Sequence, residues 1–317
     1  RQAWFLNLNP ISIGGQATFG TDYSLDGAYH RNYLTGTYMP IAFPDAVQEF
    51  KVESSGQSAE RGAGSSVSVV TKSGTNDLHG DLFYFVRNDS FGSAREYFST
   101  KKSTYKRNQF GGTVGGPIMK NRLFYFGGFQ DSIRRENPGT SIANVPTAAV
   151  LAGDWTSFAS APCNLGTARV LRAPFVNNQI SPSLYVAPSV FMANRLLDTL
   201  KQDGITPDPC GRITYNSPSN EDDRQYVGKA DYQVSSKQSA FMRVLATQQK
   251  VPNSFSLDPN LLNWGSTGLD QLATSAAIEN TYTFSPNIVQ AFRFAFNRTA
   301  HRYTPNLAFS YCTAGVN

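Results

Sequence analysis

Charged residues are scarce in this chain. Asp, Glu, Lys and Arg make up 16% of its 317 residues, against about 25% in an average soluble domain. The chain also lacks any apolar run of about 18 residues, which excludes a helical membrane protein. Aromatic residues, in contrast, reach 13%, and this content argues against global disorder. One architecture reconciles few charges, many aromatics and no long apolar run, namely amphipathic β-strands in which every second residue is apolar.

Histidine and cysteine are equally scarce, with three of each. So few and so widely spaced ligands argue against a metal centre built from several of them. The chain contains no Walker A, H-E-x-x-H or G-x-S-x-G motif, and its Ser-x-x-Lys matches lack the companion boxes of penicillin-binding enzymes. We therefore predict no catalytic residue, no metal site and no cofactor, and we do not expect an enzyme.

The charge balance is mildly basic, with 28 Lys and Arg against 23 Asp and Glu. The densest cationic cluster comprises Lys101, Lys102, Lys106 and Arg107. It matches no nucleic-acid-binding module, and we interpret it as a solvated loop with no nucleic-acid partner. Anionic partners, such as outer-leaflet lipid or an anionic solute, stay open.

Alternation with a period of two residues recurs from residue 77 onward. In the segment 224–234 (RQYVGKADYQV), even positions from 226 onward are apolar or small and odd positions, apart from Val227, are polar. A strand with a different solvent on each face requires this pattern. Similar patterns, weakened by Phe241 and Leu245 in one strand, predict a leading strand and three hairpins. The seven predicted strands cover 78–87, 107–118, 123–133, 224–234, 239–247, 271–284 and 288–298.

The connections between these strands alternate in length. The segments 88–106, 134–223 and 248–270 are long, whereas the turns near 119–121, 235–238 and 285–287 are short. Outer-membrane barrels combine short periplasmic turns with long extracellular loops, while a soluble β-sandwich would have short connections throughout. The predicted fold is therefore all-β, an antiparallel transmembrane β-barrel.

Two segments depart from this pattern. Residues 1–76 are rich in Gly, Ser and Thr, with β-like runs at 47–52 and 66–71, and we predict a separate small domain there. The connection 134–223 is too long for a bare loop. Apolar residues at helical spacing predict a helix at about 187–202 within it.

The three cysteines are Cys163, Cys210 and Cys312. Cys163 and Cys210 share the long connection, so a disulfide between them is plausible in an oxidising compartment. Free thiols are an equally open alternative.

Several motifs resemble a known family. The segments 45–52 (DAVQEFKV), 58–62 (SAERG) and 69–76 (VVTKSGTN) are similar to the late plug segment of TonB-dependent outer-membrane receptors, in particular the Oar-like branch. The similarity continues in 79–83 (HGDLF), 87–89 (RND), 107–112 (RNQFGG) and 115–118 (GGPI). The earlier segment 24–27 (SLDG) resembles the family's LDG plug motif. Residues 21–133 are the specific part of this resemblance, and later segments support it.

The resemblance implies that residues 1–76 are the C-terminal part of a plug domain and that 77–317 hold the first barrel strands, with 134–223 the largest extracellular loop. It implies energised uptake of a scarce solute across the outer membrane of a Gram-negative-type bacterium. The partners implied are a TonB-type periplasmic energy-coupling protein, outer-membrane lipid and an unknown solute, which could be a small molecule, a peptide or a glycan. A plug is expected to be polar, because it packs against a wet lumen.

Strand parity then assigns a face to each polar residue of the barrel. The predicted lumen-facing residues are Arg107, Gln109, Lys229, Asp231, Arg243, Glu279, Arg293 and Asn297. For these side chains, ion pairs between plug and barrel are favoured over direct contact with solute. The predicted lipid-facing set is Tyr226, Tyr232, Phe284, Phe292, Phe294 and Phe296.

Strand number and motifs also bear on completeness. Seven strands cannot close such a barrel, because bacterial single-chain barrels have even strand numbers and plugged ones have about 22 strands. With no signal peptide or TonB box in the sequence, we expect a fragment of a receptor. Two rival hypotheses stay open: a non-transporting adhesive or self-assembling surface β-protein on the same scaffold, and a soluble carbohydrate-binding or hydrolytic β-domain.

Overall fold

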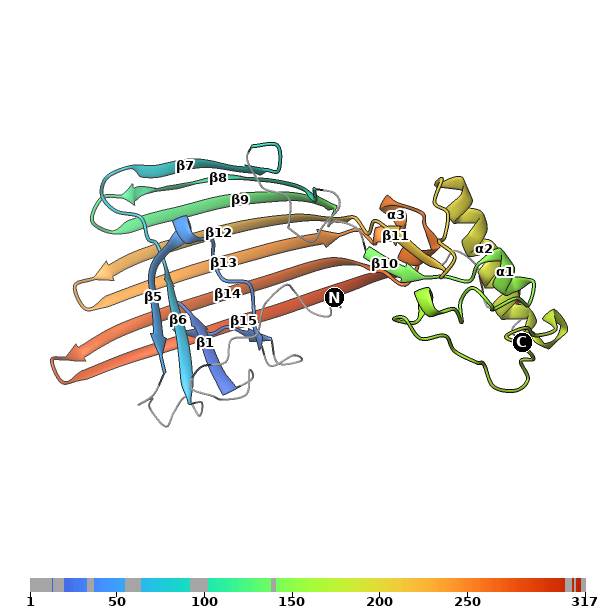
Figure 1. Cartoon of the computed structure of the whole chain (residues 1–317). Coiled ribbons are helices and arrows are strands. Elements are labelled where there is room, and N and C mark those ends of the chain that lie inside the picture. The colour runs from blue at the N-terminus through green and yellow to red at the C-terminus, as the bar shows by residue number, and fades with distance from the viewer. Residues whose placement is uncertain are drawn as a thin grey trace.

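The computed structural model describes residues 13, 20–32, 37–54, 64–91, 102–137, 141–305, 310 and 312–314. Its dominant feature is an antiparallel sheet of seven long strands (Figure 1). In sheet order they are β15 (Ile288–Pro305), β14 (Thr267–Ser285), β13 (Gln238–Val251), β12 (Ser219–Ser235), β9 (Leu123–Asn137), β8 (Thr104–Met119) and β7 (His79–Asn88). The all-β prediction is confirmed, and each predicted strand is present. The sheet is open, because β7 and β15 each have one edge without a neighbour among the described residues.

Most of the long strands extend further than the alternation predicted. The prediction ended one strand at 133 and began the next at 224, whereas β9 and β12 stay paired out to Glu136 and Ser219. The long connections predicted at 88–106, 134–223 and 248–270 are correspondingly shorter. The physical reason is that both faces are polar near these strand ends. Backbone hydrogen bonds continue the sheet there, while the side-chain alternation has disappeared.

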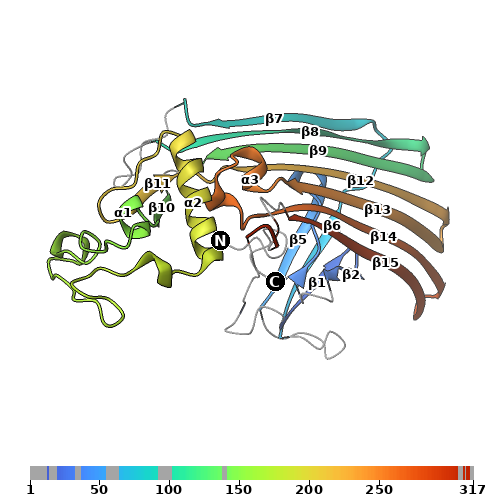
Figure 2. The same cartoon turned by 90° about the vertical axis from the view of Figure 1, so that its right-hand side faces the viewer.

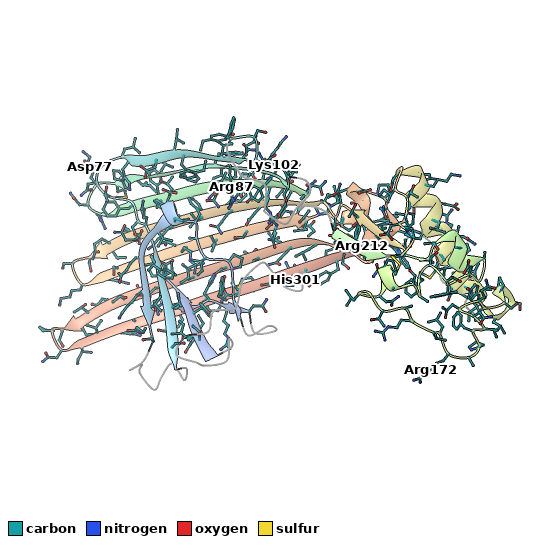
Figure 3. The ribbon with its side chains drawn as sticks, in the orientation of Figure 1. Asp77, Arg87, Lys102, Arg172, Arg212 and His301 are labelled. Carbon is teal, nitrogen blue, oxygen red and sulfur yellow. A yellow bond between two sulfur atoms is a disulfide. The ribbon has the colours of Figure 1, made fainter. Side chains whose placement is uncertain are left out.

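The two ends of the large sheet differ. Tight turns at 120–122, 236–237 and 286–287 lie at one end, which we call the turn end. At the other end, the loop end, the chain leaves for its long connections. Figure 3 shows Asp77 at the turn end and Lys102 towards the loop end.

A four-stranded small sheet lies across one face of the large sheet (Figures 1 and 2). It consists of β2 (Ala28–Tyr29), β1 (Thr21–Leu25), β6 (Ser65–Thr71) and β5 (Val47–Glu53), in that order. The runs predicted at 47–52 and 66–71 correspond to β5 and β6. A two-stranded ribbon of β3 (Arg31–Asn32) and β4 (Thr37–Tyr38) completes this region. The motif at 58–62 lies outside the described residues.

The main apolar core lies between the two sheets. Tyr23, Leu25 and Val67 of the small sheet pack in one cluster with Val227 and Leu245 of the large sheet. Val227 on β12 and Leu245 on β13 interrupt the alternation of their strands because they are part of this core. The contact between the two sheets therefore contains an apolar cluster, which the expectation of a polar plug did not include. A sheet this small cannot enclose a core of its own, so it buries its apolar face against the larger one.

The connection between β9 and β12 folds beyond the loop end, where Figure 3 shows Arg172 and Arg212. We call its described part, 141–218, the excursion. It contains β10 (Ser141–Asn144), α1 (Ala148–Leu151), α2 (Ala187–Gln202) and β11 (Arg212–Tyr215), and β10 pairs with β11. The helix predicted at 187–202 is confirmed. It ends in a Schellman motif, with Gly204 at φ +68° and the Ile205 N–H donating to the Leu200 carbonyl at 2.8 Å.

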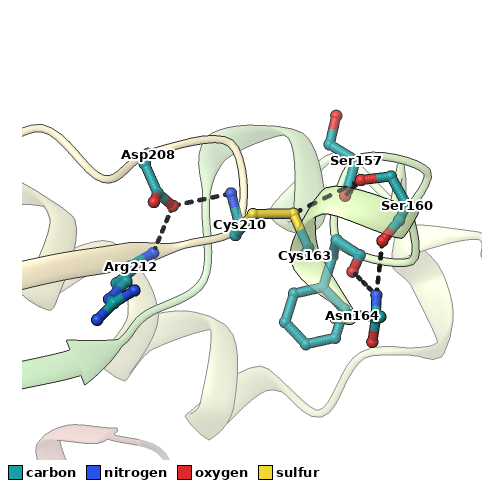
Figure 4. The surroundings of a disulfide bond; sticks show 8 residues. Ser157, Ser160, Cys163, Asn164, Asp208, Cys210 and Arg212 are labelled. Carbon is teal, nitrogen blue, oxygen red and sulfur yellow. Dashed lines mark hydrogen bonds between the residues drawn. A yellow bond between two sulfur atoms is a disulfide. The ribbon is translucent and has the colours of Figure 1, made fainter. Parts of the chain in front are cut away.

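The excursion has its own small core and a covalent link. Val145, Leu200 and Ile213 are buried together, and Leu262 from the next long connection packs against them. That connection also contains α3 (Ser254–Leu257). A disulfide joins Cys163 and Cys210, with 5.3 Å between their Cα atoms (Figure 4). Of the two alternatives for this pair, the structure has the disulfide.

Around the disulfide, local hydrogen bonds set the turn that precedes β11. The Asp208 carboxylate accepts from the backbone N–H groups of Cys210 at 2.9 Å and Arg212 at 2.8 Å (Figure 4). Cys312 is a free, exposed thiol. No helix among the described residues is long and apolar enough to span a membrane.

Candidate functional site

The hairpin between β1 and β2 carries the central residue of the contact between the sheets. Its turn is Asp26-Gly27, and both residues have positive φ, at 50° and 72°. Two-residue hairpin loops of this kind favour Asp-Gly, because Asp tolerates the left-handed region and Gly adopts it freely. The SLDG motif thus encodes a turn that brings Asp26 against the large sheet, where the residue is 6% exposed.

The Asp26 carboxylate binds groups from both sheets. One oxygen, Oδ1, accepts from the Thr71 N–H at 2.9 Å and from the Thr71 hydroxyl at 3.0 Å. Arg243 Nε donates to Oδ2 at 3.2 Å, and Lys229 Nζ lies 3.5 Å from Oδ1. Arg243 is 1% exposed and Lys229 is 9% exposed. One carboxylate therefore compensates two cations that water hardly reaches.

Hydrogen bonds to neutral groups stabilise the remaining positive charge. Arg243 donates to the Ser275 hydroxyl at 2.7 Å and to the Ser275 carbonyl at 3.1 Å. Lys229 donates to the Thr71 carbonyl at 3.3 Å, and its ammonium lies 5.3 Å from the centre of the Phe241 ring. Phe241, which weakens the alternation of its strand, thus faces a cation inside the molecule.

A second contact forms where β15 meets the β1–β2 hairpin. Arg293 donates to the Gly27 carbonyl at 2.6 Å and is ion-paired with Glu279. Asn297 donates to the Tyr29 carbonyl at 2.7 Å. A Cβ added to Gly27 would lie 2.6 Å from Arg293 Cζ. The positive φ of Gly27 favours glycine at this position, and a Cβ there would also displace the guanidinium of Arg293.

Gln225 makes the third contact, on β12. Its amide oxygen accepts from the Phe43 N–H at 2.6 Å, and its amide nitrogen donates to the Ile41 carbonyl at 2.9 Å. The same nitrogen donates to the Thr247 hydroxyl at 2.9 Å. A side-chain amide offers a donor and an acceptor together, so Gln225 binds the 41–43 segment as a neighbouring strand would.

His30 stabilises the small sheet from within. The residue is 2% exposed, and its Nε2 lies 2.8 Å from the Pro40 carbonyl oxygen. A carbonyl only accepts, so Nε2 carries the proton in the neutral ring. Burial lowers the pKa of His30 to about 4. The ring is therefore neutral at physiological pH.

The predicted lumen-facing residues divide into two groups. Six lie at or beside the contact with the small sheet: Lys229, Asp231, Arg243, Glu279, Arg293 and Asn297. The other two, Arg107 and Gln109, lie nearer the loop end. There Arg107 donates to the Ser132 hydroxyl at 3.1 Å and Gln109 to the Gln130 side chain at 2.8 Å. Arg107 and Gln109 therefore bind residues of the large sheet and not of the small sheet.

Sequence reasoning missed Asp26 and Gln225 as site residues. Each left a signal. Asp26 is the acidic residue of the SLDG motif, and Gln225 has the same parity as Lys229 and Asp231 on β12. No local sequence pattern indicated which residues would bind either side chain.

A cavity of about 690 Å³ opens between β15 and the β1–β3 region. Its lining includes Tyr29, Arg31, Asn32, Arg293, Asn297 and His301. These side chains offer hydrogen-bond donors, acceptors and positive charge, which suits a polar or anionic small molecule. No group of three or more side chains suited to a metal ion occurs among the described residues.

The opposite face of the large sheet, the outer face, is apolar and exposed. Leu82 is 92% exposed, Tyr226 54%, Phe292 63% and Phe294 59%. An exposed apolar surface of this extent marks a face that meets something other than water. Parity placed Tyr226 and the phenylalanines on this face.

Comparison with known proteins gives one family match and several similar proteins. Residues 70–316 match a family described as outer membrane beta barrel domain. A stretch of 134 residues is 28% identical to the TonB-dependent transporter Oar of Myxococcus xanthus, covering 39% of this chain and 13% of Oar. This match agrees with the resemblance to the Oar-like branch that the motifs indicated.

Two solved structures are similar to this chain over most of its length. The siderophore receptor PirA from Acinetobacter baumannii gives a TM-score of 0.46 at 11% identity, covering 89% of this chain and 32% of PirA. PiuA, a siderophore receptor from the same species, gives 0.41 at 12% identity, covering 95% and 43%. The chain thus spans less than half the length of each of the three proteins.

Proposed function

This chain belongs to the outer membrane beta barrel domain family, and from that premise we propose that it forms part of a TonB-dependent receptor that takes up a scarce solute. In this proposal the large sheet is a section of the barrel wall. The small sheet is part of the plug that closes the lumen. A TonB-type periplasmic protein supplies the energy that opens a path past the plug.

One observation carries the proposal: the small sheet is held on the inner face of the large sheet by the Asp26–Lys229–Arg243 cluster. The cluster links segments that are 217 residues apart in sequence. A plug must stay closed at rest and yield to a directed pull. Discrete charged contacts suit both needs, because they are strong when dry and are weakened once water enters.

The proposal also gives the molecule an orientation. Short turns face the periplasm in barrels of this kind, and long loops face outward. The loop end and the excursion would then be extracellular. The disulfide between Cys163 and Cys210 supports a place outside the cytoplasm, because disulfides persist in the oxidising environments of the periplasm and the cell surface.

The cavity beside β15 is the basis for the proposed solute class. That cavity lies between the proposed plug and wall, and its arginines and amides suit a polar solute. A ferric chelate, an oligosaccharide and an oligopeptide each meet this description.

Uptake tests the proposal directly. A strain lacking the gene and a complemented strain are grown with a ferric chelate, an oligosaccharide or an oligopeptide as the limiting nutrient. We expect complementation to restore growth on one of the three, and we expect removal of the TonB-type protein to abolish that gain. Equal growth of both strains on all three nutrients, or a gain independent of the TonB-type protein, would contradict energised uptake.

The excursion favours a second candidate function, an adhesive surface protein on the same scaffold. Its own core and its disulfide make it a stable projection beyond the loop end. Deleting 141–218 would separate the two functions. Loss of cell attachment with uptake retained would support the adhesive role, and loss of uptake with attachment retained would support the receptor.

A further inference from the structure

A second carboxylate, that of Asp231, lies beside the Asp26–Lys229–Arg243 cluster. Asp231 follows Lys229 by two residues on β12, so both side chains point to the inner face of the large sheet. It lies within electrostatic reach of Lys229 and of Asp26. Among the described residues, however, Lys229 and Arg243 form their ion pairs with Asp26. Asp231 is therefore a neighbour of the cluster that pairs with neither cation.

The Asp231 carboxylate can accept another hydrogen bond. The Ser73 side chain donates one hydrogen bond to it. Its Oδ2 atom is buried and has no hydrogen-bond partner among the described residues. A buried acceptor without a partner is costly, and a charged one more than a neutral one. Oδ2 can therefore receive a cation that comes within reach.

The space next to this carboxylate suits the end of a lysine side chain. A cavity of about 200 Å³ has Asp231, Phe241 and Glu279 in its lining. Strand register puts these three residues in one row across β12, β13 and β14. The Lys229 ammonium already lies 5.3 Å from the centre of the Phe241 ring, and its four-carbon stem is flexible. A rotation of this side chain can therefore carry the ammonium from Asp26 towards Asp231.

Lys229 depends on the small sheet more than Arg243 does. Its two oxygen partners, the Asp26 carboxylate and the Thr71 carbonyl, both belong to the small sheet. Arg243 also donates to the hydroxyl and the carbonyl of Ser275, which is part of the large sheet. Departure of the small sheet would thus remove both oxygen partners of Lys229 and leave Arg243 with two.

Glu279 is the other carboxylate in the row of Asp231, and it is already used. It is ion-paired with Arg293 on the neighbouring strand. It also accepts from the Thr281 hydroxyl at 3.0 Å. Asp231 is therefore the better acceptor for a displaced ammonium on this face.

From this arrangement we propose that Asp231 is the second counter-ion of Lys229 and receives its ammonium when Asp26 leaves the large sheet. The proposal rests on the proposed function, in which the small sheet is a plug that moves. An unpaired buried cation is strongly destabilising. The transfer keeps Lys229 neutralised in the docked and the undocked state, and it thereby lowers the free energy needed to move the plug.

This role gives the two carboxylates opposite effects on docking. Asp26 stabilises the docked state, whereas Asp231 stabilises the undocked state, in which it alone neutralises Lys229. In the docked state Asp231 also repels Asp26, and removing its charge relieves that repulsion. An Asp231 that served only as a fixed partner of Lys229 would instead stabilise docking, as Asp26 does.

Hydrogen-exchange mass spectrometry on the purified whole chain tests this difference in sign. Protection of β1 and β6 reports how often the small sheet leaves the large one. We expect Asp231→Asn to slow exchange in these strands about five-fold, and Asp26→Asn to accelerate it. The new asparagine keeps an oxygen for the Ser73 side chain, so the substitution removes the charge and leaves this hydrogen bond.

The matched control is Asp81→Asn on β7. Asp81 is exposed and lies on the same face, opposite Thr113, but β8 and β9 separate its strand from β12. This variant should change exchange less than about two-fold. In a Lys229→Gln background, Asp231→Asn should also change exchange less than about two-fold, because the cation that Asp231 receives is absent.

Three results would overturn the proposal: faster exchange in Asp231→Asn, exchange that changes no more than in the control, or an equal effect with and without Lys229. These results are independent of the uptake test. Absence of uptake together with opposite signs for the two variants would contradict the proposed function alone. Energised uptake together with the same sign for both would contradict the transfer of Lys229 alone.

Discussion

Asp26 shows how much of this structure depends on one carboxylate. It accepts hydrogen bonds from the small sheet and faces two buried cations of the large sheet. Removing one member of such a group leaves charge in a place that water hardly reaches, which costs far more than the net value of the ion pair.

We predict that Asp26→Asn weakens the docking of the small sheet by about 3 kcal/mol. Arg243 and Lys229 would keep their charges and lose their counter-ion. Hydrogen-exchange mass spectrometry at constant pH measures the protection of β1 and β6. Glu49→Gln is the control, because Glu49 is exposed on β5 and its loss should cost less than about 1 kcal/mol. Equal protection in the two variants would refute the role of Asp26.

His30 makes the stability of the small sheet depend on pH. Its pKa is about 4 in the folded protein and about 6.5 in an unfolded chain. Between these values the unfolded chain binds more protons than the folded one, so stability falls as pH falls. We predict full stability above pH 6.5 and a loss of about 3 kcal/mol by pH 4.

The measurement for His30 is denaturant unfolding at pH 7.5 and pH 4.5. The variant His30→Gln keeps a donor for the Pro40 carbonyl and does not titrate, so it should lose less stability over the same interval. If the variant and the unmodified protein lose the same amount, other groups account for the pH dependence.

At this scale, the face on which a side chain lies could be predicted from the sequence, whereas its bonding partner could not. Parity alone placed Lys229, Arg243 and Arg293 on the inward side of their strands. It could not connect Arg243 to Asp26, because the two are 217 residues apart and nothing local records the pairing. Nor could parity show that Arg107 and Gln109 differ from the other inward residues. Their partners, Ser132 and Gln130, belong to the large sheet and not to the small one.

At the scale of elements, strand existence was predictable and strand ends were not. Where the outer face is apolar and the inner face is polar, side chains alternate, so the long strands left a period-two signal. Towards the loop end both faces are polar and the signal vanishes, although β9 and β12 stay paired. The β1–β2 hairpin was missed for a different reason. It is short and polar, and such a hairpin is stable only when packed on a larger sheet.

The excursion should depend on its disulfide. Cys163 and Cys210 are 47 residues apart, and a cross-link over a loop of that size contributes about 2–4 kcal/mol. We predict that replacing both cysteines by serine raises the proteolytic sensitivity of 141–218 and leaves the large sheet intact. Limited proteolysis with peptide mapping measures both parts. Unchanged cleavage of the excursion would show that its small core suffices.

At the scale of the whole molecule, the structure shows where the few charged residues lie. Charged residues lie in the contact with the small sheet, as Lys229 and Arg243 do, and near the loop end of the large sheet, as Arg224 and Asp222 do. The outward positions of β12 from Tyr226 to Tyr232 and of β15 from Phe292 to Phe296 carry no charge. The composition alone indicated amphipathic strands. It could not show that the inner face would bury an apolar core against a second sheet, because that core joins residues from separate parts of the chain.

The central claim is that the outer face of the large sheet meets lipid and the inner face holds the small sheet. The most direct test is a spin-label scan of residues 240–247 on β13 in bilayers, which compares collision with oxygen and with a water-soluble nickel complex. We predict alternation along the strand, with oxygen favoured at Ala240, Met242, Val244 and Ala246 and both reagents restricted at Arg243 and Leu245. Equal access of both reagents at successive positions, or access of the nickel complex at Met242 and Val244, would contradict it.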